Sequence, residues 1–455
     1  MNNPIATGEM YDLIVIGAGM AGISAAQKGA ANGWRVAIVD SLPYGGTCAL
    51  RGCDPKKILR RGAEIIDSAR LKGKGIDPAG LAVNWSDLMT HKHGFTDPMP
   101  DSMESNLVGE GVDTLHGHAR FVGTDQIDID GTRYQATRFL IATGARPRPL
   151  TFSGSEHLID STDFLDLDAL PARILFVGGG FISFEFAHLV ARAGSTPLIV
   201  DRGERPLKSF DPDLVELLVD RGREVGIELR RNTDITAVER TNDVYQVTLE
   251  HGGTKEIVEV DLVVHGAGRV ADLAALGLEE AGVEWSERGV RVAGHLQSTS
   301  NPAVWAAGDS ADTAGVPLTP VATSEAKVAT SNMIKGTTIT PDYTGIPTAV
   351  FTIPELVRVG MLESEAIEPG IDLDVRFSDT SSWYSNYRIG ETTAAAKILI
   401  DKAHDRIVGA HLLGPEYAEL VNTFGLAIKL GLTTRQLKSA TAAYPTVGSD
   451  LGSML

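Results

Sequence analysis

The sequence predicts an α/β protein, because two separate stretches follow one order: a β-branched strand, a glycine-rich turn, a helix, a second strand and an aspartate. The first stretch begins with the strand Tyr11–Ile16 and ends at Asp40. The second begins with the strand Arg173–Val177 and ends at Asp201. A buried parallel strand that runs through a glycine turn into a helix starts a βαβ unit, so we expect two Rossmann-like dinucleotide-binding domains.

The end of the chain predicts a domain of another kind. Residues 395–413 alternate in polarity around a polar turn, as in a hairpin, and Ala418–Gly431 has the pattern of an amphipathic helix. Proline-rich residues 140–149 and the HGAGR segment at 265–269 are typical of crossovers between domains. We therefore expect one dinucleotide-binding domain at 1–150 and 270–345, a second at 151–269, and a C-terminal α+β domain at 346–455.

Length and charge restrict the possible functions. A chain of 455 residues suits about three domains of roughly 150 residues each. Its net charge of −18 argues against nucleic acid and anionic membranes as partners. The sequence has no apolar stretch of spanning length and does not open with a basic then apolar segment, so we expect a cytoplasmic protein.

The first glycine turn has the spacing of a dinucleotide fingerprint, with Gly17, Gly19 and Gly22 before a helix. The first glycine allows the tight turn, the second lets a pyrophosphate approach the backbone, and the third lets helix and strand pack closely. The phosphates then lie at the positive end of the helix. Asp40 ends the second strand, where a carboxylate accepts hydrogen bonds from a ribose.

The second glycine turn has Gly178 and Gly180, but Ser183 stands at the third position. The alternative to a nucleotide site here is an ordinary βα turn of a doubly wound sheet. The residues after its second strand give opposing signals about the cofactor. Asp201 favours the ribose hydroxyl of NADH, whereas Arg202 and Lys208 favour the 2′-phosphate of NADPH, and we lean to NADPH.

The chain has two cysteines, Cys48 and Cys53, and both lie just after the first βαβ unit. Asp54–Leu59 predicts a helix with proline near its first position. If this helix begins near Cys48, the two sulfurs lie on adjacent turns and can be bridged. Two unrelated buried cysteines and half a metal site are the alternatives, but no further cysteine completes a thiolate metal site. We favour a redox-active disulfide and no metal.

Five segments in order resemble the class I pyridine nucleotide-disulfide oxidoreductases, a family that includes glutathione reductase, dihydrolipoamide dehydrogenase and mercuric reductase. The segments are GGTCALRGCDPKK at 45–57, IATGARPRP at 141–149, WAAGD at 305–309, LTPVA at 318–322 and FTIPELVRVG at 351–360. The resemblance implies FAD in the first dinucleotide-binding domain, a nicotinamide cofactor in the second, and a homodimer formed by the C-terminal domain.

The resemblance also implies roles for individual residues. Cys53 would be the sulfur next to the flavin, and Cys48 the sulfur that meets the substrate. Lys56 or Lys57 would form an ion pair with Glu185 near the flavin. Asp309 would bind the ribityl chain, and the helix that starts at LTPVA would face the flavin pyrimidine. Further cofactor contacts are implied at Gly46, Thr47, Thr143, Gly144, Gly268, Arg269, Thr319 and Ala322.

The C-terminal segment departs from the family pattern. Disulfide reductases of this family end with His-Pro-Thr and a glutamate five residues after the histidine. This pair, lent by the other subunit, acts as acid and base for the leaving thiol. This chain has Tyr444 and Ser449 at those positions. A phenol with an ordinary pKa of about 10 is a poor base at neutral pH, so we expect little turnover of glutathione disulfide.

Three hypotheses follow from this departure. The first is an NAD(P)H-dependent flavin reductase of an unassigned disulfide or thiol-derived small oxidant. The second sends the electrons to a metal ion, a quinone or another small oxidant, as in mercuric reductases, which also carry tyrosine here but use an extra cysteine pair that this chain lacks. The third is a redox-sensing flavoprotein with little turnover.

Overall fold

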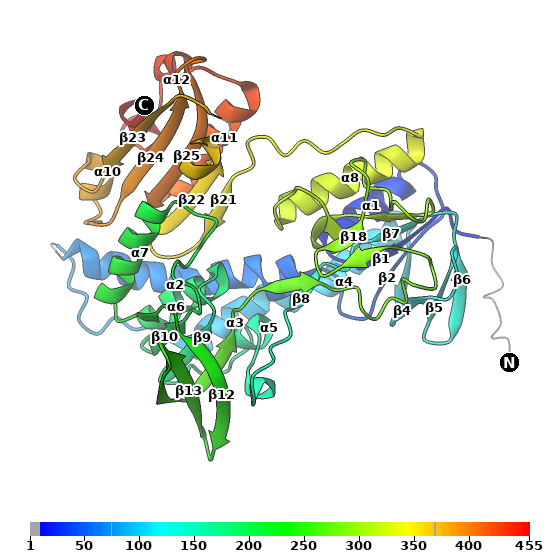
Figure 1. Cartoon of the computed structure of the whole chain (residues 1–455), viewed down its shortest axis with the longest axis horizontal. Coiled ribbons are helices and arrows are strands. Elements are labelled where there is room, and N and C mark those ends of the chain that lie inside the picture. Colours follow the sequence, from blue (N-terminus) through cyan, green and yellow to red (C-terminus); the bar gives the residue numbers. More distant parts are fainter. Residues whose placement is uncertain (1–9, 74, 368–369) are drawn as a thin grey trace. The chain divides into compact units, whose positions relative to one another are not determined.

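The computed structural model describes residues 10–73, 75–367 and 370–455 and divides the chain into two compact units (Figure 1). The first unit contains the described residues up to Lys56, together with His91–Arg148 and Arg269–Tyr343. The second contains Lys57–Thr90, Pro149–Gly268 and Thr344–Leu455. The three predicted domains stay a prediction. Among the described residues, no helix has both the length and the apolarity needed to span a bilayer.

The first unit is built on a parallel five-stranded sheet in the order β19-β7-β1-β2-β3. Its strands are β1 (Leu13–Ile16), β2 (Val36–Asp40), β3 (Asp113–His116), β7 (Phe139–Ile141) and β19 (Val304–Ala306). The central strands β1 and β7 are buried throughout, as expected of strands covered on both faces, and so is the edge strand β19. Helices α1 (Met20–Ala30) and α8 (Thr319–Lys335) pack side by side against this sheet (Figure 1).

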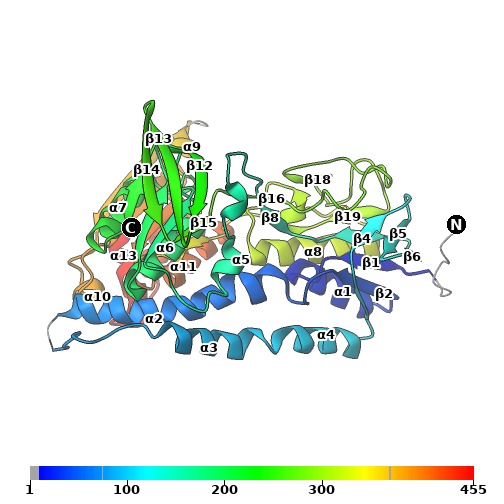
Figure 2. The same cartoon turned by 90° about the horizontal axis from the view of Figure 1, so that it is seen from below.

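The second unit contains a parallel four-stranded sheet in the order β11-β10-β9-β15. The strands are β9 (Arg173–Val177), β10 (Thr196–Val200), β11 (Glu228–Arg230) and β15 (Leu262–His265), with α6 (Phe181–Ala193) following β9 and α7 (Pro212–Glu224) following β10. Figure 2 shows the antiparallel strands β12 (Asp234–Thr241), β13 (Val244–His251) and β14 (Thr254–Val260) as a separate ribbon. Each unit therefore contains one of the two predicted βαβ repeats.

The C-terminal part of the second unit is an antiparallel five-stranded sheet in the order β21-β22-β25-β24-β23. The predicted hairpin is present as β24 (Ala395–Asp401) and β25 (Arg406–Gly414), and the predicted helix is α11 (Tyr417–Leu430). The remaining strands are β21 (Thr348–Val350), β22 (Glu355–Gly360) and β23 (Leu373–Asp379). Val421 and Phe424 on α11 are buried against this sheet, which gives the C-terminal part its own apolar core. The predicted α/β class with an α+β C-terminal domain is confirmed.

Candidate active site

The two cysteines lie at the start of the long helix α2 (Cys53–Lys72). The α-helix begins at Cys53, whereas Cys48 lies in the preceding π-helical turn Thr47–Arg51. The condition that the α-helix starts near Cys48 is therefore not met, because Gly52 separates the two segments with a non-helical backbone. The two side chains are nevertheless hydrogen-bonded to each other. Both cysteines are free thiols in the structure, and Cys53 is the more exposed.

The hydrogen bond between the two thiols shifts their pKa values in opposite directions. The hydrogen bond with Cys48 is the main cause that lowers the pKa of Cys53 from 9.0 to about 6, and the charge of Lys56 lowers it further. The same hydrogen bond, followed by burial, raises the pKa of Cys48. Negative charge therefore resides on Cys53, and Cys48 remains the proton donor between the two sulfurs. The nearby carboxyl of Asp54 opposes this effect at Cys53 without reversing it.

Thr319 is a third member of this group, since its side chain is hydrogen-bonded to both cysteines. Thr319 is the first residue of α8, and the N-cap residue of that helix, Leu318, provides no side-chain cap. The first turn of α8 thus leaves backbone amides for another partner. The sequence led us to expect Thr319 at a cofactor, but its contact with the thiols was not foreseen, because it depends on where α8 packs.

The first glycine turn has the geometry that a dinucleotide requires. Gly19 is the N-cap of α1 and offers no side-chain cap, so the amides of the first helical turn can receive a phosphate. A Cβ at Gly22 would lie 1.9 Å from the carbonyl oxygen of Gly17, so a side chain cannot fit there. Asp40 accepts hydrogen bonds from the backbone N–H of Ala18, at 2.7 Å, and of Leu42, at 2.9 Å. These bonds hold the turn together at the end of β2.

Other residues predicted to contact the flavin gather around the same sheet. The hydroxyl of Thr143, which follows β7, is buried and has no hydrogen-bond partner among the described residues, as expected if a ligand supplies one. Asp309 lies in the turn after β19, where burial raises the pKa of its carboxyl and the charge of Arg269 opposes the rise. Gly46 packs against Gly19, since a Cβ at Gly46 would meet the Gly19 Cα at 2.5 Å. These residues fit a bound dinucleotide in the first unit.

The second glycine turn also fits a dinucleotide, with Gly180 as the uncapped N-cap of α6. Asp201 is buried, and it accepts a hydrogen bond from the backbone N–H of Gly203 at 3.2 Å. Arg202 and Lys208 are exposed beside it. The carbonyl oxygen of Lys208 accepts a hydrogen bond from Arg205, a third basic residue that the sequence analysis did not single out.

Glu185 lies on α6 and is buried, with 4% of its surface exposed. Its carboxylate accepts a hydrogen bond of 2.7 Å from the backbone N–H of Phe351. The ammonium group of Lys57 lies 3.8 Å from the centre of the Phe351 ring and 3.9 Å from the carboxylate of Glu355. The ion pair of Glu185 with Lys56 or Lys57 stays a prediction, and the contribution of Phe351 was not foreseen.

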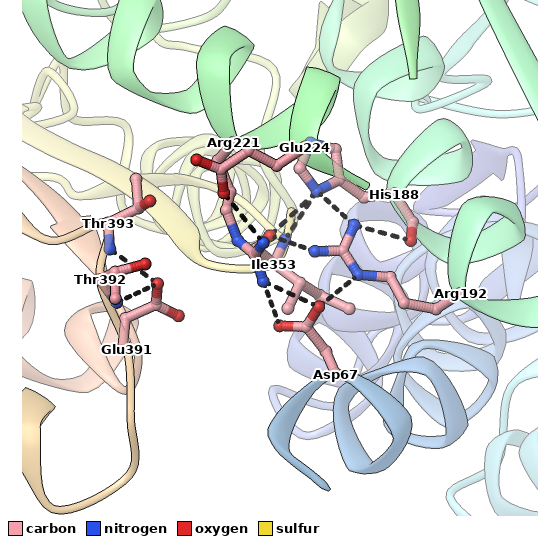
Figure 3. Close-up of polar contacts among 9 residues, drawn as sticks. All are labelled: Asp67, His188, Arg192, Arg221, Glu224, Ile353, Glu391, Thr392 and Thr393. Atoms are coloured by element: carbon pink, nitrogen blue, oxygen red, sulfur yellow. Dashed lines mark hydrogen bonds and ion pairs between the residues drawn. The ribbon is translucent and has the colours of Figure 1, made fainter. Parts of the chain in front are cut away.

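A buried ionic cluster, formed by Asp67, His188, Arg192 and Arg221, anchors α2 (Figure 3). The carboxylate of Asp67 accepts hydrogen bonds from Arg192, at 2.9 Å, and from Arg221, at 3.0 Å. Arg192 also donates to the carbonyl of Ile353 at 2.9 Å. Burial lowers the pKa of His188 well below its ordinary value, so this imidazole is neutral. The cluster ties α2, whose first residue is Cys53, to α6, which carries Glu185.

Tyr444 is 82% exposed and lies in the loop that precedes the last helical turns of the chain. This exposure agrees with the idea that Tyr444 acts in the other subunit of a dimer, which remains a prediction.

Comparison with known proteins assigns the chain to a family. The model of the pyridine nucleotide-disulphide oxidoreductases matches residues 11–326, and the model of their dimerisation domain matches residues 346–454. The chain belongs to the pyridine nucleotide-disulphide oxidoreductase family. It is thus an NAD(P)H-dependent flavin disulfide oxidoreductase, as predicted, and family members use FAD and a nicotinamide cofactor. The dimerisation domain supports a homodimer.

Its relatives carry several activities. The chain is 32% identical to a glutathione reductase of Burkholderia cepacia, over 97% of both chains. It is 30% identical to a mercuric reductase of Lysinibacillus sphaericus, over 99% of this chain and 83% of that one. Among solved structures, the HOCl-induced flavoprotein disulfide reductase RclA of Escherichia coli, in its Cu(II) complex, has a TM-score of 0.88 and 26% identity, over 98% of this chain and 99% of that one.

Proposed function

We propose that this chain carries electron pairs from NAD(P)H, through FAD, to the Cys48–Cys53 pair, which then reduces a small oxidant in the cytoplasm. Residues 1–150 and 270–345 hold FAD, residues 151–269 hold the nicotinamide cofactor, and residues 346–455 form the dimer interface. The observation that carries the proposal is the pair of free thiols that are hydrogen-bonded to each other and to Thr319. In such a pair the Cys53 thiolate can accept the proton of Cys48 through their hydrogen bond, which leaves Cys48 as the thiolate that attacks.

Each cysteine has a distinct task in this proposal. FAD, which the residues around Gly17 and Asp309 would hold, would supply the transfer of two electrons from the nicotinamide cofactor to the cysteine disulfide. With two protons, the disulfide then becomes two thiols. Cys48 attacks an oxidised sulfur of the substrate and releases one thiol, and Cys53 displaces the second thiol as the Cys48–Cys53 disulfide forms again. The low pKa of Cys53 and the charge of Lys56 keep this sulfur as the thiolate in the two-electron-reduced protein, before the substrate reacts.

We propose NADPH as the preferred cofactor, with NADH also accepted. Asp201 is buried and accepts one backbone hydrogen bond, from Gly203, but a carboxylate can accept further bonds, so it can still bind a ribose hydroxyl of NADH. Arg202 and Lys208 are exposed and can pair with a 2′-phosphate. An NADH rate well above the NADPH rate would reverse this preference.

A metal ion is the second candidate acceptor. Tyr444 replaces the catalytic histidine of disulfide reductases, which lowers the rate at which a leaving thiol is protonated. The Escherichia coli neighbour was solved as a Cu(II) complex, and mercuric reductases are among the relatives. Two single-electron reductions of Cu(II) by the dithiol regenerate the disulfide and balance the two electrons from one NADPH. A quinone would accept the same pair of electrons.

The experiment is anaerobic stopped-flow reduction by NADPH, followed by acceptors: glutathione disulfide, Cu(II), Hg(II) and a quinone. We expect complete flavin reduction and slow turnover of glutathione disulfide. The Cys48→Ser variant keeps flavin reduction but loses turnover of acceptors that need the dithiol. Equal rates in wild type and Cys48→Ser identify acceptors reduced directly by flavin. A flavin that NADPH does not reduce contradicts the proposal and favours a binding or sensing role.

A pH titration tests the assignment of charge to Cys53. The pKa of Cys53 is lowered to about 6, so its thiolate is present above that pH and is lost as the pH falls through it. In protein reduced by two electrons, the long-wavelength absorbance of a thiolate beside oxidised flavin should therefore appear with a midpoint near pH 6. Cys53→Ser should abolish this band, and Lys56→Met should move the midpoint upward. A wild-type midpoint near the ordinary thiol pKa of about 8.5 contradicts the assignment.

A gain-of-function variant tests whether Tyr444, in place of histidine, limits the turnover of glutathione disulfide. Tyr444→His restores an imidazole that titrates near neutral pH and can protonate a leaving thiol. We expect turnover of glutathione disulfide to rise by about tenfold or more, which is less than the roughly 100-fold that a positioned general acid typically gives, because Ser449 leaves the imidazole without the usual glutamate. Tyr444→Phe is the control and should not raise it.

A further inference from the structure

We propose that Glu325 is a positioning residue for the flavin, because it fixes the turn that carries Asp309 against the first half of α8. The inference rests on the proposed binding of FAD by Asp309 and the α8 N-terminus. Glu325 lies on α8 and is almost completely buried, with 1% of its surface exposed. The sequence analysis gave no reason to select this residue.

The carboxylate of Glu325 is held by three hydrogen bonds from the turn and the chain beyond it. One oxygen accepts from the backbone N–H of Gly308 at 2.7 Å. The other accepts from the hydroxyls of Thr313, at 2.8 Å, and of Tyr343, at 2.6 Å. A buried carboxylate is costly unless such donors surround it, so Glu325 and its three donors specify one arrangement of this segment.

Close packing reinforces this arrangement. Ala322 and Glu325 stand three residues apart on one face of α8, and the turn lies against both. Gly308 has φ +70°, and a Cβ there would meet the Ala322 Cβ at 2.9 Å. A Cβ at Gly315 would lie 2.8 Å from a Glu325 carboxylate oxygen. The backbone therefore wraps closely around the carboxylate, and neither partner can move alone.

The phenol of Tyr343 remains a donor in this network. Burial, and then the hydrogen bond with Glu325, raise the pKa of Tyr343 far above its usual range, so its proton stays in place. The bond between Tyr343 and Glu325 is thus formed by a neutral donor and a charged acceptor, which is stronger than a bond between neutral groups.

The network links two parts of the proposed flavin site. Asp309 directly follows Gly308, whose N–H is held by Glu325. Thr319 lies on the same helix as Glu325, six residues earlier, and its side chain contacts both cysteines. Glu325 therefore sets the position of the Asp309 turn relative to the helix end that contacts the dithiol. Replacement of Glu325 should therefore lower the affinity for FAD more than it lowers the free energy of unfolding of the apoprotein.

Flavin titration of the apoprotein tests the inference. We expect Glu325→Ala to weaken FAD binding by about tenfold or more, because three hydrogen bonds are lost at once. Glu325→Gln keeps an acceptor for Gly308 and should weaken binding by about threefold. Tyr343→Phe removes one donor, keeps the packing, and should weaken binding by a similar factor of about three.

The matched control is Glu391→Ala. Glu391 is also buried, and it accepts hydrogen bonds from the backbone N–H groups of Thr392 and Thr393 (Figure 3). This variant should lower the urea midpoint of the apoprotein without changing FAD affinity. Unchanged FAD affinity in Glu325→Ala, or in Tyr343→Phe if the alanine variant does not fold, overturns the inference. Wild-type protein that binds no FAD would instead refute the proposed function, so the two failures are distinguishable.

Discussion

The two glycine turns of the chain share one backbone geometry and differ in where their small residues lie. Gly17 and Gly178 each donate a backbone hydrogen bond of 2.8 Å to the second strand of their sheet, at Val39 and Val200 respectively. Each turn then starts a helix without a side-chain cap, at Gly19 and Gly180. The backbone of the second turn is therefore as well suited to a phosphate as that of the first.

The two turns differ in which position carries the glycine. It is on the helix in the first turn, and directly after the neighbouring strand in the second. In the first turn, Gly22 is the small residue on the helix, and Ala142 follows the neighbouring strand β7. In the second turn, Ser183 is on the helix and Gly266 follows the neighbouring strand β15. Ala142 and Gly266 are equivalent, since each donates to the residue before its glycine turn, at 2.8 Å and 2.9 Å. A Cβ at Gly266 would lie 2.1 Å from the Ser183 hydroxyl.

The Ser183 side chain is accommodated in the second turn because Gly266, which is 83 residues further along the chain, leaves room for its hydroxyl. The two acids also differ, because Asp40 accepts two backbone bonds in its turn, whereas Asp201 is buried beside the exposed bases Arg202 and Lys208. Each turn should thus respond differently to the same kind of substitution.

The largest effect is expected for Gly22→Ala. The added methyl would lie 1.9 Å from the Gly17 carbonyl oxygen, so the helix or the turn must move. We expect a loss of about 3 kcal/mol in the free energy of unfolding and loss of bound flavin. Urea denaturation and the flavin-to-protein absorbance ratio measure these. Gly94→Ala, at a helical glycine with nothing within 4 Å, is the control and should be neutral or slightly stabilising.

The next largest effect is expected for the two basic residues that follow the second turn, Arg202 and Lys208. We expect the double variant Arg202→Ala and Lys208→Ala to raise the KM for NADPH about thirtyfold, from the loss of two charge-assisted contacts worth about 1 kcal/mol each. The KM for NADH should not change. Arg223→Ala, which removes an exposed arginine of α7 paired with Asp220, should leave both KM values unaltered. An equal rise in KM for both cofactors would mean that these basic residues do not bind the 2′-phosphate.

A smaller effect is expected for Gly266→Ala, which should cost about 1–2 kcal/mol of stability through its clash with the Ser183 hydroxyl. Adding Ser183→Gly should restore most of this loss, although a glycine in a helix itself costs about 0.5–1 kcal/mol. A double-mutant cycle in urea gives the coupling. Purely additive losses would mean that the two positions do not share one space.

The smallest effect is expected for Ser183→Ala. The Ser183 hydroxyl is buried and has no hydrogen-bond partner in the described part of the chain. Its removal should leave the free energy of unfolding unchanged or raise it by up to about 1 kcal/mol. A clear loss of stability would reveal a partner for this hydroxyl, such as a bound nucleotide or water, and comparison with and without NADPH separates the two.

Local sequence was sufficient for much of the fold. The β-branched strands next to glycine turns predicted both βαβ units, and alternation predicted the hairpin β24–β25, because periodicity and turn chemistry act over a few residues. The positions of the Gly17 and Gly178 turns and of Asp40 and Asp201 followed from the same signals, whereas the break at Gly52 that leaves Cys48 outside α2 did not. The family segments added Thr319 and Asp309, which no periodicity singles out.

The sequence by itself selected the candidate residues for the chemistry, because a glycine spacing or a cysteine pair lies within a few positions of the chain. Tertiary structure alone decided which distant groups tune them: Thr319 at the thiols, Glu325 at the Gly308 amide, Asp67 between two arginines, and Gly266 opposite Ser183. Their partners lie far away in the chain. Hydrogen bonding and steric exclusion depend on distances of a few ångströms, which only the packed fold defines.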